Sequence, residues 1–238
     1  MPAELAVGLT ADLGADLSPL WLTLRLALVT TLVLLALGTP LAWWLAFSRS
    51  RIKAVVEAVT ALPLVLPPTV LGFYLLILLG PTAPIGKWWV RITGDQLTFS
   101  FSGLVVASAL YSLPFMIQPL RSAFAGIGRD WLETAATLRA SPLDTFFSVA
   151  VPLSARGFLS AAILSFAHTM GEFGVVLMVG GSIPGETKVI SIAIFEHVET
   201  LEYGKAHLLA GVMLGFSFLV LLAIFLVDRR RPGLGPGG

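Results

Sequence analysis

Apolar residues fill five long stretches of this chain, and shorter segments with most of the charged and turn-forming residues separate them. A helix of about 20 apolar residues spans the hydrocarbon core of a bilayer. The pattern therefore predicts an all-α, polytopic membrane protein that forms a single transmembrane domain over residues 1–238. The predicted spans cover about 17–47, 55–79, 99–120, 153–179 and 207–227.

Composition supports this class and excludes several others. Only 12% of the residues are charged, against about 25% in a typical soluble domain, and 56% are hydrophobic. The formal net charge of +1 indicates no nucleic-acid partner, and the chain has no cysteine for a disulfide, a thiolate metal site or a thiol nucleophile. The first 20 residues lack any basic residue, which argues against a cleavable signal peptide. We expect neither a metal nor another cofactor.

The distribution of lysine and arginine predicts the orientation, because basic residues are retained on the cytoplasmic side of a membrane. With five spans, three basic groups fall on one side: Arg49, Arg51 and Lys53; Arg121, Arg129, Arg139 and Arg156; and Arg229, Arg230 and Arg231. The other side receives only Lys87, Arg91, Lys188 and Lys205. We therefore expect the acidic amino terminus outside and the carboxyl-terminal tail in the cytoplasm.

The cytoplasmic segment at about 121–154 is predicted to form a helix, a tight turn and a second helix. Within "RDWLETAATLRA", a narrow stripe of small and apolar groups recurs at helical spacing: Leu132, Ala135, Ala136 and Arg139. Ser141 can cap the second helix, with Pro142 at its first position and Asp144 completing a capping box. The spacing alone leaves two interpretations open: an ordinary helical loop, or a docking element whose small alanines let another protein approach closely.

This segment resembles the "EAA" coupling loop of ABC importer permeases, whose pattern is E-A-A, three residues, G, and a closing L-P. Here Glu133, Thr134 and Ala135 stand for E-A-A, and Val151-Pro152 closes the loop. Arg139 occupies the glycine position, which departs from the pattern. The resemblance implies that the loop inserts into a cleft of a cytoplasmic ATPase subunit and transmits its closure to the membrane helices.

Three further stretches resemble the molybdate permease branch of that family: "LPLVLPPTVLGFYLL" from Leu62, "GEFG" from Gly171 and "IPGET" from Ile183. The resemblance implies a homodimer in the lipid bilayer of a bacterial inner membrane, with two cytoplasmic ABC ATPase subunits and a periplasmic molybdate-binding protein. Because this chain contains no nucleotide-binding motif, ATP hydrolysis is expected in the partner subunit and not here. The alternatives are a sulfate or tungstate permease of the same family and, in a different class, an ion-driven carrier or an intramembrane enzyme.

Two groups of residues inside the predicted spans are candidates for the path and the gate. Prolines disrupt a helical ladder, and a membrane accepts this only where protein or a water-filled cavity satisfies the freed backbone groups. We therefore expect Pro67, Pro68 and Thr69 to line the translocation path, the alternative being a kinked and well-packed helix.

In the fourth span, His168 and Glu172 are spaced to share a helix face, and Gly171 and Gly174 predict a break. We expect Glu172 to order this break through His168 or a backbone donor, because a bare carboxylate would repel an oxyanion.

Arg139 carries a conformational prediction. A left-handed backbone costs about 1–2 kcal/mol for a residue with a Cβ, so we expect Arg139 to stay right-handed and the helix to continue through it. Its guanidinium would then pair with a carboxylate on the ATPase, the alternative being a solvated arginine that replaces a helix-ending glycine.

Overall fold

The computed structural model describes residues 17–229, and within this range every regular element is helical. The all-α fold class is therefore confirmed for the described part of the chain. The acidic amino terminus and the tail beyond Arg229, which we expect on opposite sides of the membrane, lie outside the described residues. The chain divides into two compact units, which we call the main unit (Ser18–Val189) and the hairpin unit, described from Ile190 onward.

The main unit contains a series of long and short helices in chain order. They are α2 (Ser18–Phe47), α3 (Ile52–Ala61), the 3-10 turn η1 (Leu62–Leu64), α4 (Pro68–Leu79), α5 (Pro84–Thr93), α6 (Phe101–Ala125), α7 (Arg129–Thr137), α8 (Pro142–Thr145), the π-helical turn η2 (Phe146–Ala150), α9 (Val151–Leu153), α10 (Ala155–Met170) and α11 (Gly174–Gly180). The hairpin unit holds α12 (Ile190–Glu199) and α13 (Tyr203–Arg229), which pack against each other.

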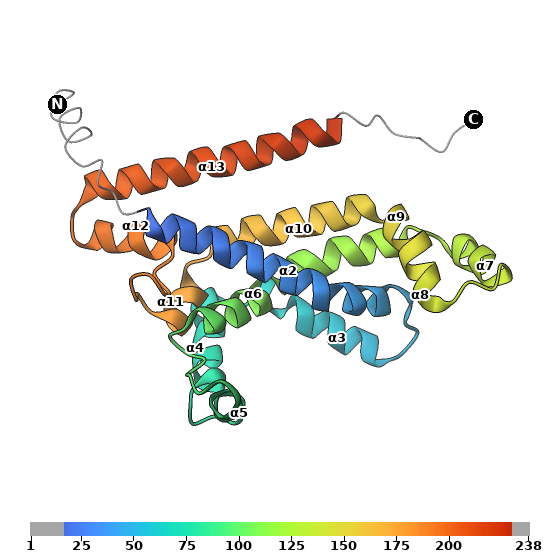
Figure 1. The fold of residues 1–238 in the computed structure, drawn as a ribbon, viewed down its shortest axis with the longest axis horizontal. Helices are drawn as coiled ribbons and strands as arrows, with labels where there is room; N and C mark the ends of the chain where they lie inside the picture. The colour runs from blue at the N-terminus through green and yellow to red at the C-terminus, as the bar shows by residue number, and fades with distance from the viewer. Residues whose placement is uncertain (1–16, 230–238) are drawn as a thin grey trace. The chain divides into compact units, whose positions relative to one another are not determined.

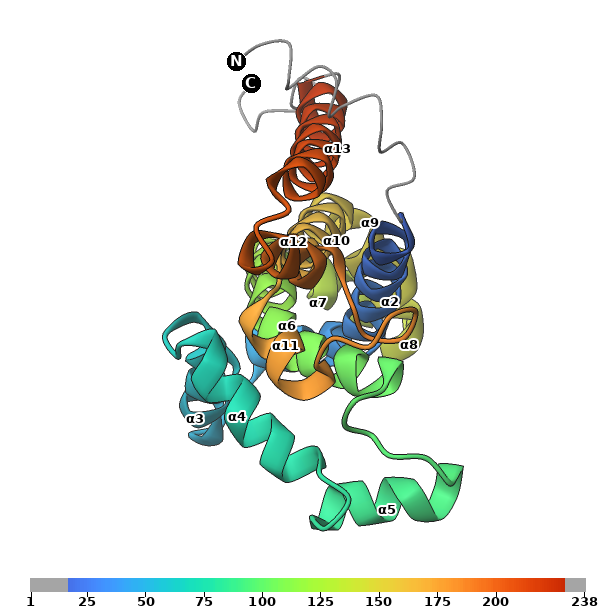
Figure 2. The same ribbon diagram turned by 90° about the vertical axis from the view of Figure 1, so that its left-hand side faces the viewer.

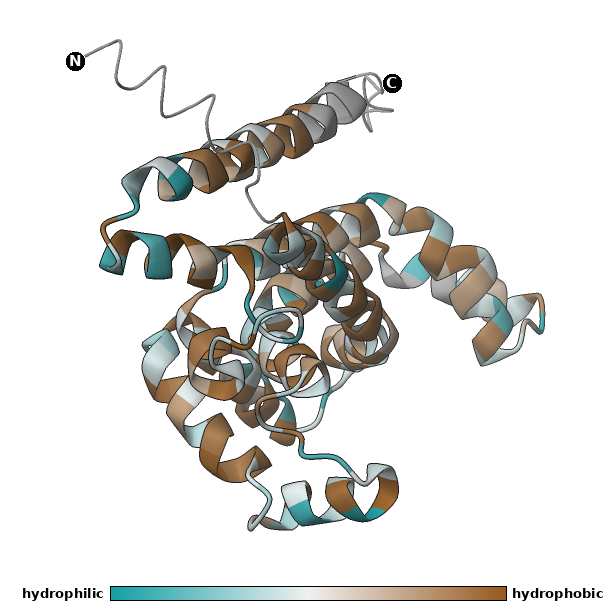
Figure 3. Ribbon diagram, turned by 60° about the vertical axis from the view of Figure 1, so that its left-hand side comes forward, coloured by the Kyte–Doolittle hydropathy of each residue, from teal (hydrophilic) through white to brown (hydrophobic). Residues whose placement is uncertain are grey.

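Helices α2, α6 and α10 pack against one another at the centre of the main unit (Figure 1). Small residues let them approach closely: a Cβ on Gly38 of α2 would lie 2.9 Å from Met116 Cγ of α6, and a Cβ on Gly157 of α10 would overlap Ala123. Lipid tails are as apolar as leucine, so helices in a membrane associate through such close packing. In Figure 3 the long helices are mostly hydrophobic, and polar residues gather at turns and helix ends.

The second predicted span, 55–79, is broken into two helical segments in the structure, so it does not form the single kinked helix of the alternative. The segment Ile52–Leu64 and α4 meet at an angle of 113°. Pro67 lies between them with φ −55° and ψ 137°, an extended backbone, because a residue before a proline is disfavoured in the helical region. Pro68 then begins α4 at its first position, where its missing N–H costs no helical hydrogen bond.

The fourth predicted span, 153–179, consists of α10 and α11 with a break between them, as "GEFG" predicts. Among the described residues, three helices are long and apolar enough to cross a membrane alone: α2, α6 and residues 203–222 of α13. The number rises to five if Ile52–Leu79 and Pro142–Met170 each count as one bent span. About five spans therefore agrees with the described structure, although two of them are not straight.

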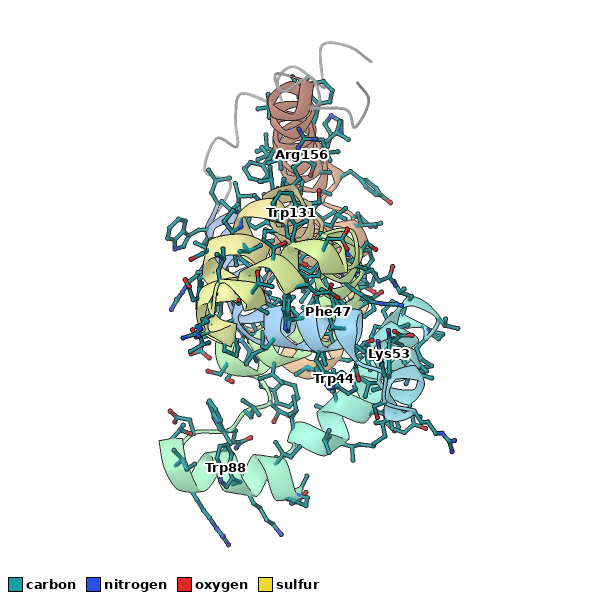
Figure 4. The ribbon with its side chains drawn as sticks, turned by 90° about the vertical axis from the view of Figure 1, so that its right-hand side faces the viewer. Trp44, Phe47, Lys53, Trp88, Trp131 and Arg156 are labelled. Carbon is teal, nitrogen blue, oxygen red and sulfur yellow. The ribbon has the colours of Figure 1, made fainter. Side chains whose placement is uncertain are left out.

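Two amphipathic helices, α5 and α12, were not predicted from the sequence. Helix α5 ends at Gly94, which adopts a left-handed φ of 82° and donates its N–H to Val90. It projects from the rest of the main unit and carries Trp88 (Figures 2 and 4). Both helices are only 10 residues long, so each gives fewer than three turns of helical periodicity. Such a short pattern is hard to recognise next to the longer apolar runs.

Candidate functional site: coupling loop and helix breaks

The predicted helix–turn–helix is present, but its turn contradicts the prediction for Arg139. Helix α7 ends at Thr137, and Arg139 has a φ of 58°, so its backbone is left-handed. The N–H of Arg139 donates to the Ala136 carbonyl at 3.0 Å, and the N–H of Ala140 donates to the Ala135 carbonyl at 3.1 Å. These two bonds are a Schellman motif, which satisfies carbonyls at a helix end and places its left-handed residue where the family pattern has glycine.

The expectation was wrong because it weighed the strain of Arg139 without the two hydrogen bonds that the left-handed turn makes. Ending the helix at Thr137 leaves Ser141 free to start the next one directly. Ser141 has an extended backbone, and its Oγ accepts from the Asp144 N–H at 3.1 Å, so the predicted cap is present. The Asp144 carboxylate accepts from the Ser148 hydroxyl at 2.8 Å and thereby extends the cap into the following turn.

Only part of the predicted stripe is exposed. Ala135 is only 6% exposed and packs within its own chain, whereas Ala136 and Arg139 of the stripe and the neighbouring Glu133 and Thr134 are exposed. The side chain of Leu132 lies outside the described part of the structure. Four large apolar side chains between residues 131 and 147 are more than half exposed and form what we call the loop surface: Trp131, Leu138, Leu143 and Phe147. Figure 4 marks Trp131 on this loop.

A π-helical turn separates the capped start of the second loop helix from Pro152. The N–H of Val151 donates to the Phe146 carbonyl, one residue further back than in an α-helix. A proline ring inside an α-helix clashes with the carbonyl four residues earlier, and the wider π turn relieves this clash. The helical run ends at Leu153, close to the predicted end, and α10 leaves at 74° to it after Ser154.

Aromatic rings connect this loop to the three central helices. Phe146 packs edge-on against Trp43 of α2, with ring centroids 5.2 Å apart, and contacts Phe124 of α6 at 6.2 Å. Phe124 in turn meets Phe158 of α10 at 5.7 Å. Such pairs contribute about 0.5–1.5 kcal/mol beyond their buried area. The loop is therefore in ring contact with α2 and α6 through Phe146, and with α10 through Phe124.

The two helix breaks that the sequence singled out meet in space. Gly174, the first residue of α11, lies against Pro68, the first residue of α4: a Cβ on Gly174 would be 2.8 Å from the Pro68 Cβ. One turn further, a Cβ on Gly72 would lie 2.8 Å from Met178 Cβ and 3.2 Å from Val175 Cα. Helices α4 and α11 therefore begin side by side and run in the same direction.

The residues at this junction differ in exposure. Pro67 and Thr69 are exposed in the single chain, and Pro68 is half-buried. A helix amino terminus carries a partial positive charge from its unpaired N–H groups. The amino terminus of α4 and the exposed hydroxyl of Thr69, its second residue, therefore both lie at the break of the second predicted span.

His168 and Thr169 at the end of α10 bind α6 through one hydroxyl. The Ser112 Oγ lies 2.9 Å from His168 Nδ1 and 3.0 Å from Thr169 Oγ1. The His168 ring stacks on Phe115 with centroids 4.0 Å apart. Gly171 closes the helix with N–H bonds to the carbonyls of residues 167 and 168.

Glu172 lies just beyond the helix and is 4% exposed. Its carboxyl lies beside Ser108, one turn before Ser112 on α6, with Tyr111 also within electrostatic range. His168 is therefore hydrogen-bonded to α6 before the break, and Glu172 is buried beside Ser108 of the same helix after it. Ser108 and Ser112 were not predicted from the sequence, where only their spacing of four residues within an apolar run sets them apart.

The "IPGET" motif forms a compact loop after α11. The Thr187 hydroxyl donates to the Gly180 carbonyl at 2.7 Å and accepts from the Ile183 N–H at 3.1 Å. Thr187 is fully buried, and Gly185 supplies a left-handed φ of 79°. The loop closes the end of α11 and so fixes the helix that begins at the junction.

Among the described residues, no group of three or more metal-binding side chains is present. The hydroxyl of Ser112 instead joins α6 to the end of α10 through His168 and Thr169. This contact positions α10 at its break.

Comparisons with known proteins agree on one family. A family model described as binding-protein-dependent transport system inner membrane component matches residues 38–232. A molybdenum transport system permease protein of Azotobacter vinelandii is 59% identical over 219 residues, which are 92% of this chain and 97% of that protein. A molybdenum transport system permease protein of Haemophilus influenzae is 33% identical over 224 residues, which are 93% of this chain and 98% of that protein.

Among solved structures, a chain of the MetNI methionine ABC transporter in inward-facing conformations has a TM-score of 0.69. The match covers 93% of this chain and 98% of that one, at 14% sequence identity. At so low an identity, the similarity shows a shared fold.

Proposed function

Because this chain belongs to the family of binding-protein-dependent transport system inner membrane components, we propose that it is the permease subunit of an ABC importer that carries molybdate into the cytoplasm. The main support for molybdate as the substrate is the 59% identity to a molybdenum transport permease over 92% of the chain. Residues 1–238 act in this proposal as one transmembrane domain. The chemistry of ATP hydrolysis belongs to a separate subunit.

The proposed partners follow from the family and from the loop. Two copies of the chain form the path between them, two cytoplasmic ABC ATPases dock on the loops, and an external molybdate-binding protein delivers the anion. The loop surface supports the docking role, because exposed Trp131, Leu138 and Phe147 offer a soluble partner an apolar contact. The proposed orientation puts the amino terminus outside and the loop and tail in the cytoplasm.

The junction of α4 and α11 is the proposed gate region. Two helices that start side by side at a break are a common way to place N–H groups toward an anion within a membrane. Thr69 adds an exposed hydroxyl there. Glu172 is held against α6 beside Ser108, so its role is to fix the break and not to touch the anion.

The aromatic contacts of Phe146 supply the mechanical step. Closure of the ATPase pair moves the loop, and Phe146 transmits this movement to α2 and, through Phe124 and Phe158, to α6 and α10. The helices then reorient around the junction, and the path opens alternately to each side.

Uptake of radiolabelled molybdate tests the proposal. A bacterial strain without its own molybdate permease should recover uptake when this chain is expressed with its ATPase and binding protein, and excess unlabelled molybdate should compete. Recovery of sulfate uptake in place of molybdate would assign the chain to the sulfate alternative. Uptake that needs an ion gradient and no ATPase would reject the importer class.

A further inference from the structure

A cavity of about 320 Å³ lies between α2, α3 and α6, apart from the helix breaks. Its polar lining includes Glu57 of α3 and three residues of α6: Gln118, Arg121 and Ser122. The α6 residues are spaced i, i+3 and i+4, so their side chains share one face of the helix. A guanidinium, an amide and a hydroxyl thus open into the same space.

Two cations converge on one oxygen of the Glu57 carboxylate: Arg121, which lines the cavity, and Lys53, which lies one helical turn before Glu57. Arg121 Nη2 lies 3.1 Å from Glu57 Oε1, and Lys53 Nζ lies 3.8 Å from the same atom. The local charge is therefore +1, since Lys53 and Arg121 outweigh Glu57 alone. Figure 4 marks Lys53 on α3.

We propose that this cavity is an oxyanion exchange site, in which the Glu57 carboxylate holds the place of the transported anion until substrate arrives. The inference rests on the proposed function and adds a site to it. A tetrahedral dianion neutralises both cations, which the single charge of Glu57 does not. Arginine also donates paired N–H groups in a geometry that suits an oxyanion.

The place of the site indicates when it acts. Lys53 and Arg121 both belong to the basic groups that the sequence predicts on the cytoplasmic side. An anion that has passed the helix breaks meets this cavity on its way out. When Glu57 returns to Arg121 and Lys53, it displaces the anion into the cytoplasm, because like charges compete for the same cations.

The alternative is a latch, in which the Glu57–Arg121 pair only ties α3 to α6. The two roles differ in what the single variants do. Removing either partner breaks a latch equally, so Glu57→Gln and Arg121→Gln would act alike. At an exchange site the two substitutions act in opposite directions on anion binding.

The test measures binding of radiolabelled molybdate by equilibrium dialysis to the assembled permease–ATPase complex, without the binding protein. Glu57→Gln should lower the dissociation constant about fivefold, as the loss of one competing charge at a half-exposed pair implies. Arg121→Gln should raise it by a similar factor, and Arg121→Lys should recover part of the loss. Arg91→Gln, which removes the same charge from α5, should leave it unchanged.

A charge swap completes the design. The double variant Glu57→Arg, Arg121→Glu restores an ion pair between α3 and α6 while moving the cation. A latch predicts wild-type transport and binding for the swap, and that result would overturn the exchange site, as would equal shifts in the two single variants. Molybdate uptake is measured in parallel, in cells that express the wild-type complex together with the binding protein, so a failure of the proposed function is seen separately.

Discussion

Gly174 and Pro68 approach each other so closely that a Cβ on Gly174 would lie 2.8 Å from the Pro68 Cβ. This contact joins the first residue of α11 to the first residue of α4. Two motifs that are about 100 residues apart in the sequence, "LPPT" and "GEFG", are thus one structural feature.

Gly174→Ala should destabilise the junction, because the added methyl forces α4 and α11 apart. Overpacking of this kind costs about 1–3 kcal/mol. We expect a lower thermal unfolding temperature in detergent and reduced molybdate uptake. Gly171→Ala is the matched control, since its Cβ would meet its nearest atom at an ordinary 3.8 Å. Equal effects of both variants would contradict the close contact.

Arg139→Gly should stabilise the loop, because glycine adopts the left-handed φ of 58° without the strain of a Cβ. The expected gain is about 1 kcal/mol, measured as a higher denaturation midpoint of the purified permease. Arg139→Ala keeps the strain and removes the guanidinium. If Arg139→Ala stabilises as much as Arg139→Gly, the backbone is not the cause. Arg139→Glu additionally tests a charge contact with the ATPase through the salt dependence of assembly.

Leu138→Asp should weaken binding of the ATPase subunit while the permease stays folded, because Leu138 is 78% exposed on the loop surface. Copurification of the two subunits measures the effect. Ala135→Asp should also abolish transport, but for another reason: Ala135 is buried, and an uncompensated carboxylate there unfolds the loop. Protease sensitivity of the loop separates the two variants, and a protease-resistant Ala135→Asp loop would contradict the burial.

The hairpin unit should lose stability in acid at the turn between α12 and α13. Glu202 accepts from Lys205 Nζ at 3.1 Å and from His197 Nδ1 at 2.8 Å, and these two hydrogen bonds lower the pKa of its carboxyl below the ordinary 4.5. A carboxyl whose pKa is lower in the folded than in the unfolded state stabilises the fold at pH values above its ordinary pKa. This contribution disappears as the pH falls through the lowered pKa.

Hydrogen exchange of the Glu202 amide, which donates to the His197 carbonyl, measures this stability. We expect faster exchange below pH 4.5, beyond the intrinsic pH dependence, in the wild type. Glu202→Gln should remove the effect, whereas Glu199→Gln on α12 should keep it. A wild-type profile identical to that of Glu202→Gln would reject the assignment.

Cysteine labelling tests the orientation directly, because the chain contains no native cysteine. In intact cells, an impermeant thiol reagent should label Thr93→Cys at the end of α5 and should not label Ser141→Cys in the loop turn. Both positions should react after the membrane is opened. Labelling of Ser141→Cys from outside would place the loop away from the ATPase and would overturn its coupling role.

The sequence predicts the elements of this fold better than their angles. Hydrophobic runs locate α2, α6 and α13, and the capping signals locate the turn at Ser141. The bend of 113° before α4 is larger than a kink because Pro67 and Pro68 are adjacent, so one restricts the other. That conformational coupling is not part of a hydropathy pattern.

For the candidate residues too, the sequence indicates the motifs but not the contacts between them. "LPPT" and "GEFG" were recognised one by one, but only the folded chain shows that Gly174 lies against Pro68. Ser112 escaped notice because a serine in an apolar helix has no partner in the sequence, and its partner His168 is 56 residues away. Arg139 was misjudged because hydrogen bonds at the helix end outweigh a strain of about 1 kcal/mol.

Because of the π turn at Phe146–Ala150, the number of residues in this segment determines how the loop is oriented relative to α10. A π turn holds one residue more than the α turn it replaces. Deleting that residue would let the run continue as plain α-helix, and everything before it would rotate by about 100° relative to α10. Leu143 and the preceding turn would then face another direction. A single extra residue therefore sets which face of the loop is presented to a docking partner, and an insertion or deletion here would turn another face outward without changing any side chain.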